Sequence, residues 1–170
     1  MLFRSFDLAT ASCLLSHLRD YRRGLREIRR VLVQDASFAA SCWGPVFDPY
    51  ATAWREMLDG AVGEGAAGRA AEAVVPWEDH FSRPDNLRTA LLDAGFSTIR
   101  VEEVVLSCDH SVEEYVADRA LGAGGRCGHG ALGQAGWRAF LERAEAELRR
   151  RFGDRVLYER SVVLVVGTVA

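Results

Sequence analysis

Three side chains that can form hydrogen bonds or transfer protons lie close together near the N-terminus. Ser12 and Cys13 stand near the end of an apolar run of strand length, and His17 follows four residues after Cys13. A neutral imidazole at the edge of a sheet can accept a proton from the hydroxyl group of a substrate. The same histidine could instead begin a helix and form only a local hydrogen bond. The sequence leaves both interpretations of His17 open.

Aromatic side chains form a second group of candidates. Trp43 closes a predicted strand, so it either lines a pocket for a substrate or packs under the following loop. Tyr50, Trp54 and Met57 recur at helical spacing. They form either a lid over an apolar substrate or a stripe that faces the core. Both alternatives stay open for these residues.

Two further patterns are too incomplete to predict a site. Cys127 and His129 are typical zinc ligands, but they supply only two of the four that a structural zinc ion needs. Gly122–Gly125 is glycine-rich, but it follows a predicted helix and lacks a subsequent Lys-Ser or Lys-Thr pair, as a phosphate-binding loop requires. We therefore predict neither a metal site nor a phosphate-binding loop.

Composition restricts the class of protein. The chain has 170 residues, of which 49% are apolar and 26% are charged, with a net charge of −3. The length suits one domain, the apolar fraction excludes a disordered tail, and the charge argues against a general nucleic-acid binder. No apolar run is long enough to span a membrane, and no signal peptide is recognisable. Four scattered cysteines without close pairing are typical of reduced thiols, so we expect a cytoplasmic protein.

The first elements form a βαβ pattern. Residues Phe6–Leu15 are expected to form a strand covered on both faces, as in a parallel sheet. Asp20 is the expected cap of an amphipathic helix that ends near Leu32. A turn over 34–36 then leads into a second strand over 37–43. Short connections of this kind predict two parallel strands joined by a right-handed crossover.

Capping signals and periodicity predict the remaining elements. They are a short helix over 48–58, a mobile loop or weak helix over 60–73, a helix from a Ser82 cap to Gly95, a strand over 96–107, a helix opened by a Ser111–Glu114 capping box, a glycine-rich loop over 122–136, a helix over 137–152 and a strand over 156–169. No linker divides the chain, so we expect a single α/β domain.

The order of these elements carries a resemblance to a known family. Four features follow one another along the chain: a strand that begins Phe6-Asp7, a Leu15–Leu18 turn containing His17, a helix ending in Arg30–Leu32, and Gly95-Phe96 before a valine-rich strand. This order resembles the second half of class I S-adenosylmethionine-dependent methyltransferases, in the small-molecule, type 11-like branch. The resemblance implies the C-terminal part of a Rossmann-like fold: a mixed sheet of about four strands, with the last strand between the second and third. Residues 1–170 would then be one partial domain with lid-like insertions at 48–75 and 111–153.

The resemblance also implies a reaction and roles for the candidate residues. The reaction is methyl transfer from S-adenosylmethionine to a small organic acceptor, in which positioning supplies much of the catalysis. Ser12 and Cys13 would flank the methionine end of the cofactor, His17 would be the base, and Trp43, Tyr50 and Trp54 would line the acceptor pocket. The alternative is a non-catalytic domain that binds a partner or ligand through the same pocket. No role in nucleic-acid or membrane binding is implied.

The chain also departs from the family pattern. The family's glycine-rich turn and the acidic residue that binds the ribose hydroxyls have no counterpart in this sequence. Each charge-assisted hydrogen bond of this kind contributes roughly 1.5–3 kcal/mol, so we expect this chain alone to bind S-adenosylmethionine weakly or not at all. In the family, a missing N-terminal half would pair with Leu8–Cys13. We therefore expect either that half or a second copy of the chain to cover this edge.

Overall fold

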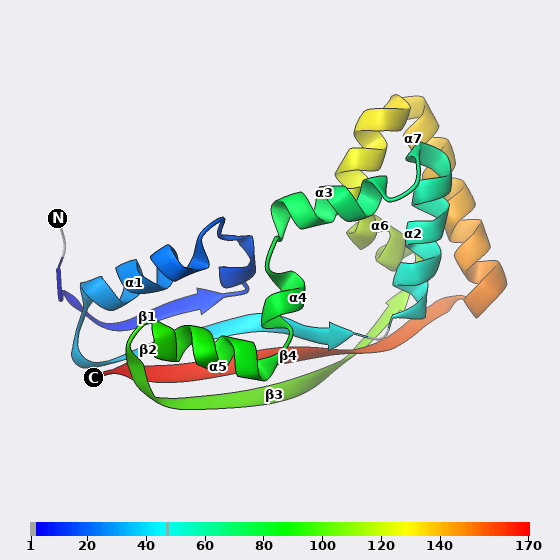
Figure 1. The fold of residues 1–170 in the computed structure, drawn as a ribbon. Coiled ribbons are helices and arrows are strands. Elements are labelled where there is room, and N and C mark those ends of the chain that lie inside the picture. The colour runs from blue at the N-terminus through cyan, green and yellow to red at the C-terminus, as the bar shows by residue number, and fades with distance from the viewer. Residues whose placement is uncertain (1–2, 47) are drawn as a thin grey trace. The chain divides into compact units, whose positions relative to one another are not determined.

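The computed structural model describes residues 3–46 and 48–170, which form two compact units (Figure 1). The first unit contains residues 3–46, 75–106 and 160–170. The second contains residues 48–74 and 107–159, close to the two segments expected as lid-like insertions. The interpretation of these segments as lids of one partial domain stays a prediction.

A four-stranded mixed sheet organises the chain. Its strand order is β1 (Phe6–Ser12), β2 (Leu32–Val46), β4 (Arg155–Val169) and β3 (Phe96–Ser111). β1 pairs with β2 in parallel, and β2 pairs with β4 antiparallel. The predicted topology is therefore confirmed, including the position of the last strand between the second and third.

The crossover between β1 and β2 contains a short 3-10 helix, η1 (Leu15–His17), and the helix α1 (Tyr21–Val31). Asp20 caps α1 as predicted, because its carboxylate accepts a hydrogen bond from the backbone nitrogen of Arg23 at 2.9 Å. This bond satisfies one of the backbone donors that every helix leaves free at its N-terminus.

The predicted turn at 34–36 is wrong. β2 begins directly after α1, and residues 34–36 lie within it as an irregularity. The register passes from Phe6 opposite Leu32 to Leu8 opposite Ser37, so β2 contains extra residues at this point. Asp35 has a φ of 62°, a left-handed conformation that aspartate tolerates better than most residues. The local turn signal therefore marks a bulge in a continuous strand.

Three helices of the first unit pack on one face of its sheet: α1, α4 (Glu78–Phe81) and α5 (Pro84–Asp93). Ser82 does not cap α5 as predicted. Its hydroxyl instead donates to the backbone oxygen of Asp79 at 2.9 Å, while Arg83 precedes α5 and Pro84 starts it. The predicted end of this helix is confirmed, since Gly95 follows it with a φ of 84°.

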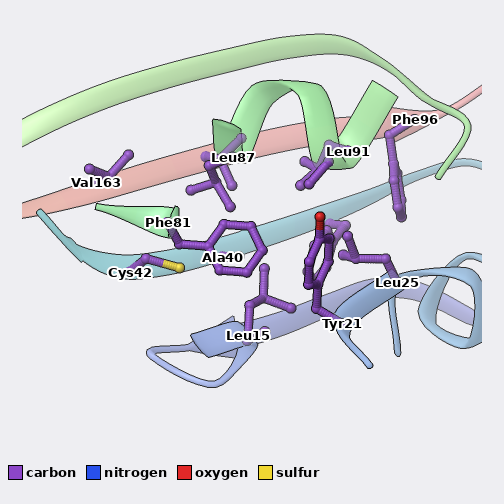
Figure 2. Packing of buried hydrophobic residues seen from close by; sticks show 14 of the residues in the cluster. Leu15, Tyr21, Leu25, Ala40, Cys42, Phe81, Leu87, Leu91, Phe96 and Val163 are labelled. Atoms are coloured by element: carbon purple, nitrogen blue, oxygen red, sulfur yellow. The ribbon is translucent and has the colours of Figure 1, made fainter. Parts of the chain in front are cut away.

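The core of the first unit lies between these helices and the sheet. Figure 2 shows leucines of η1, α1 and α5 together with Ala40 and Cys42 of β2 and Val163 of β4. Alternate residues of β4 point away from this core, and there Leu164 and Val166 are exposed. Phe6 and Leu8 of β1 are exposed as well. The expectation that the first strand is covered on both faces is therefore wrong for the described residues, because the helices of this unit pack on one face.

The second unit is mainly helical. Its helices are α2 (Pro49–Val62), α3 (Ala66–Val74), α6 (Val112–Leu121) and α7 (Ala123–Phe152). The Ser111–Glu114 capping box is present as predicted. The sequence predicts a mobile loop or a weak helix over the segment 60–73. Because α3 covers much of it, the helix alternative is confirmed there.

The predicted loop over 122–136 is wrong, because residues 123–136 are the first part of α7, which bends at Gly133 with a φ of 65°. Packing overrides the low helix propensity of glycine here. A Cβ atom at Gly128 would lie 2.6 Å from Leu58 and 2.7 Å from Trp137. Glycine therefore allows this helix to approach its neighbours closely.

None of the helices in residues 3–46 and 48–170 is long and apolar enough to cross a membrane.

Candidate functional site

The carboxyl ends of β1 and β2 bring together Ser12, Cys13 and Ser41. The parallel register places Ser12 opposite Ser41, and their hydroxyl oxygens are 3.3 Å apart. The backbone nitrogen of Cys13 donates to the backbone oxygen of Ser41 at 2.9 Å and lies 3.1 Å from its hydroxyl oxygen. The cluster thus presents two hydroxyl groups and a thiol at the sheet edge where open α/β folds bind ligands.

Cys13 holds a left-handed backbone conformation, with a φ of 48°. This conformation is costly for a residue other than glycine, and it is concentrated at functional sites. It turns the chain from β1 into η1. Beneath this turn, burial raises the pKa of the Cys42 thiol to about 11, so that thiol stays protonated and unreactive at neutral pH.

His17 is the last residue of η1, and its side chain is exposed. Its backbone nitrogen donates to the backbone oxygen of Leu14 at 3.0 Å. The neighbouring Ser16 is buried, and its backbone oxygen accepts a hydrogen bond from the backbone nitrogen of Trp77 at 3.3 Å. η1 is thus attached to the segment before α4, while the His17 imidazole remains accessible to solvent.

Trp43 lies on β2 in the first unit and is covered by an arginine. The guanidinium carbon of Arg160 is 3.6 Å from the centre of the Trp43 ring, a close cation–π contact. Arg160 also faces Glu78, with 3.7 Å between nitrogen and carboxylate oxygen, too long for a hydrogen bond. Arg160 therefore occupies one face of this indole.

Tyr50 and Trp54 belong to the second unit and are not part of the Ser12–Ser41 cluster. Both are buried: the Tyr50 hydroxyl lies 3.4 Å from the backbone oxygen of Leu157, and the Trp54 ring packs edge-on against Phe140 at 5.3 Å. The Tyr50 ring also packs against Phe152 at 4.6 Å. Both residues are core members of their unit, and Trp54 in addition borders a small cavity of about 220 Å³.

The second unit also contains a buried polar network that was not predicted from the sequence. The carboxylate of Asp48 accepts hydrogen bonds from the Tyr115 hydroxyl at 3.0 Å and from Arg119 at 3.1 Å. Its other oxygen accepts from the backbone nitrogen of Ala51 at 2.9 Å, which caps α2. Burial raises the pKa of Tyr115 far above its usual range, so this phenol stays protonated and can donate its hydrogen to Asp48.

The sequence contained a usable signal for one of the missed residues. Ser41 lies near the end of the second predicted strand as Ser12 lies near the end of the first, so parallel pairing of the two strands places them close together. No comparable signal existed for Arg160, which comes 117 residues after Trp43 in the sequence, or for the partners of Asp48. These contacts depend on how distant segments pack.

Comparison with solved structures identifies the fold. A candidate type II methyltransferase from Anaeromyxobacter dehalogenans superposes with a TM-score of 0.60 at 16% identity, and a candidate methyltransferase from Bacillus halodurans with 0.52 at 13%. Each alignment covers 99% of this chain and 66% of the other. The fold is that of the class I methyltransferases. The chain therefore spans about two thirds of the length of these methyltransferase-fold proteins.

Sequence comparison adds no relative. No protein-family model matches the chain, and no curated protein matches it significantly. The likeness to methyltransferases is thus one of fold.

Proposed function

We propose that the protein is an S-adenosylmethionine-dependent methyltransferase, or a part of one, that acts on a small organic acceptor. The observation that carries the proposal is the cluster of Ser12, Cys13 and Ser41 at the carboxyl edge of parallel strands in a methyltransferase fold. Ligands of open α/β sheets bind at this edge. The accessible imidazole of His17, four residues further on, adds a group that can accept a proton.

The donor set fits one end of the cofactor. The hydroxyl groups of Ser12 and Ser41 can each donate and accept hydrogen bonds, as the amino and carboxylate groups of a methionine require. These residues, with Cys13, would hold that end, and the cofactor would supply an activated methyl group. We assign no described residue to the adenosine end, which agrees with the weak binding expected for this chain alone.

The remaining roles belong to groups of the chain. His17 would accept the proton that a hydroxyl or amine acceptor loses, and Trp43 would form an apolar wall that orients the acceptor. The contact with Arg160 supports a positioning role for Trp43, because it holds the indole in one orientation. We further propose a cytoplasmic location, supported by the four free cysteines.

Calorimetric titration of S-adenosylhomocysteine into the 170-residue chain tests the cofactor role. We expect weak but saturable binding that Ser12→Ala or Ser41→Ala weakens by about tenfold, since each change removes one hydrogen bond to a charged group. Thr10→Ala is the matched control, because Thr10 is an exposed hydroxyl residue on the same strand and has no part in the cluster. Saturable binding that neither serine change weakens would overturn the cofactor role of this cluster.

The proposed base has a separate test. If the chain supports methyl transfer, alone or with a complementing polypeptide, His17→Ala should lower turnover more than it lowers cofactor affinity. Unchanged turnover would remove His17 from the mechanism and leave positioning as the source of catalysis.

The exposed apolar edge favours a second candidate, a non-catalytic domain that binds a partner. Leu8 retains 59% of its accessible surface on β1, and Leu164 and Val166 of β4 are also exposed. Natural proteins usually cover such edges and faces. We propose that a second copy of the chain, or another polypeptide, covers this surface in either candidate function.

Light scattering coupled to size-exclusion chromatography tests the second copy. Leu8→Lys should abolish self-association, whereas Leu157→Lys, which changes a leucine with 60% exposure in the second unit, should not. A chain that is monomeric at every concentration would leave another polypeptide as the only proposed cover.

A further inference from the structure

The second unit contains a groove that the proposed methyl-transfer residues do not line. It lies between α2 and the second part of α7 and has a volume of about 650 Å³, within the range of small-molecule sites. Met57, Gly60 and Ala61 line it from α2, and residues between Phe140 and Arg151 line it from α7. The groove therefore follows about 16 Å of α7, at the usual helical rise.

The floor of the groove is apolar. Phe140 and Ala144 are buried, and Met57 and Ala61 are half-buried beside them. The Phe140 ring is fixed by its edge-on contact with Trp54. An apolar ligand would thus meet a preformed surface rather than one that must be ordered on binding.

The rim is rich in arginine. Arg150 and Arg151 both donate to Glu147, at 2.7 Å and 2.6 Å, and Arg151 also donates to Glu56 of α2 at 3.1 Å. Arg143 lines the groove without a hydrogen bond or ion pair to any residue of the described chain. The lining has three positive charges and one negative charge, and Glu56 beside it adds a second negative charge. The rim therefore keeps an excess of one positive charge, although the whole chain has a net charge of −3. This local excess favours an anionic ligand.

The wall of the groove is open at Gly60. A Cβ atom built on this glycine meets nothing within 4 Å. Gly60 is exposed within α2, and its φ is not in the left-handed region, so other residues can replace it without backbone strain. A large side chain at this position would therefore enter the groove without a clash with the protein.

We propose that this groove binds an amphipathic carboxylate, whose apolar chain lies on the floor between Met57 and Phe140 while its carboxylate pairs with the rim arginines. Arg143 is the first of these partners, because it has no internal acceptor. The ligand class is that of medium-chain fatty acids, and the site is independent of the proposed methyl transfer.

Titration with decanoate, monitored by calorimetry and by the methyl NMR signal of Met57, tests the proposal. The chain has only two methionines, so this signal is easily assigned. We expect saturable one-to-one binding that shifts the Met57 signal, with 1-decanol binding about tenfold more weakly because it lacks the charge. Arg143→Gln should weaken decanoate binding severalfold, and Glu147→Gln should strengthen it by removing the negative charge of the rim.

Gly60→Phe should fill the groove and abolish decanoate binding. The matched control is Gly130→Phe, because Gly130 is also an exposed helical glycine with nothing within 4 Å of a built Cβ atom, and it does not line the groove. Circular dichroism checks that both variants fold. If Gly60→Phe does not fold, the Arg143→Gln titration tests the site instead. The proposal is overturned if decanoate does not bind saturably, if decanol binds as tightly, or if both phenylalanine variants retain full binding.

Discussion

The hydroxyl group of Tyr115 donates a hydrogen bond across 3.0 Å to the buried carboxylate of Asp48. The same carboxylate oxygen accepts from Arg119, so one side chain at the start of α2 connects this helix to two positions of α6. Buried charges are tolerated only when they are paired and hydrogen-bonded. Asp48 therefore connects α2 to α6 within the second unit.

Loss of this carboxylate should destabilise the second unit. Asp48→Ala leaves Arg119 without its partner and removes the cap of α2, and we expect a loss of about 2–3 kcal/mol in the free energy of unfolding. Tyr115→Phe removes one hydrogen bond and should cost about 1 kcal/mol. Urea unfolding followed by circular dichroism measures both. Asp93→Ala, at an exposed aspartate in the last turn of α5, is the control and should stay within about 0.5 kcal/mol of the wild type.

His80 should make stability depend on pH. Burial, and then the charges of Arg22 and Arg83, lower its pKa below 6.5. The folded state thus binds this proton less tightly than the unfolded state. The contribution of His80 to stability is complete above pH 6.5 and is lost as the pH falls through its folded pKa.

NMR titration of the His80 ring signal measures this shift directly. Arg22→Gln should raise the pKa of His80 toward 6.5, and His80→Gln should remove its share of the stability change between pH 7.5 and 5. A His80 pKa at or above 6.5 in the wild type would contradict the prediction.

Cys13→Gly should stabilise the first unit. The φ of 48° at Cys13 costs a non-glycine residue about 1–2 kcal/mol, of which glycine recovers part after its larger loss of chain entropy. We expect a gain of up to about 1 kcal/mol in the free energy of unfolding. The same change at Cys108, within β3, should instead destabilise by about 1 kcal/mol. Equal losses at the two positions would show that the turn at Cys13 is unstrained.

Arg160→Ala should change the environment of Trp43. Removing the guanidinium from the indole face should cost about 1–2 kcal/mol and shift tryptophan emission to longer wavelength as water reaches the ring. The spectral shift should disappear in a Trp43→Phe background, which identifies the emitting residue. Arg100→Ala, at an exposed arginine of β3, serves as the control and should leave the emission unchanged.

Local signals in the sequence determined much of the fold. Asp20 as the cap of α1, the Ser111–Glu114 capping box and Gly95 after α5 all lie where the sequence predicted them. These features involve residues close together in the chain, so the local sequence pattern is enough to predict them. The strand order followed from the resemblance to a known family, and the structure has the same order.

Only the tertiary structure decided the features that depend on distant segments. Residues 123–136 of the glycine-rich segment form the first part of α7 despite the low helix propensity of glycine. Gly128 allows this helix to lie close to Leu58 and Trp137, a contact between distant segments. The strand predicted to be buried on both faces is an exposed edge, because apolar character shows that a strand can be covered but not what covers it.

The same distinction between local and long-range features applies to the candidate site. Its residue types near the carboxyl ends of the strands could be predicted from the sequence, because parallel strands that follow one another end at the same edge of a sheet. The proximity of Ser12 and Ser41 could also be expected from a parallel pairing of the two strands. The cover of Trp43 by Arg160 could not, because it depends on packing between elements far apart in the chain.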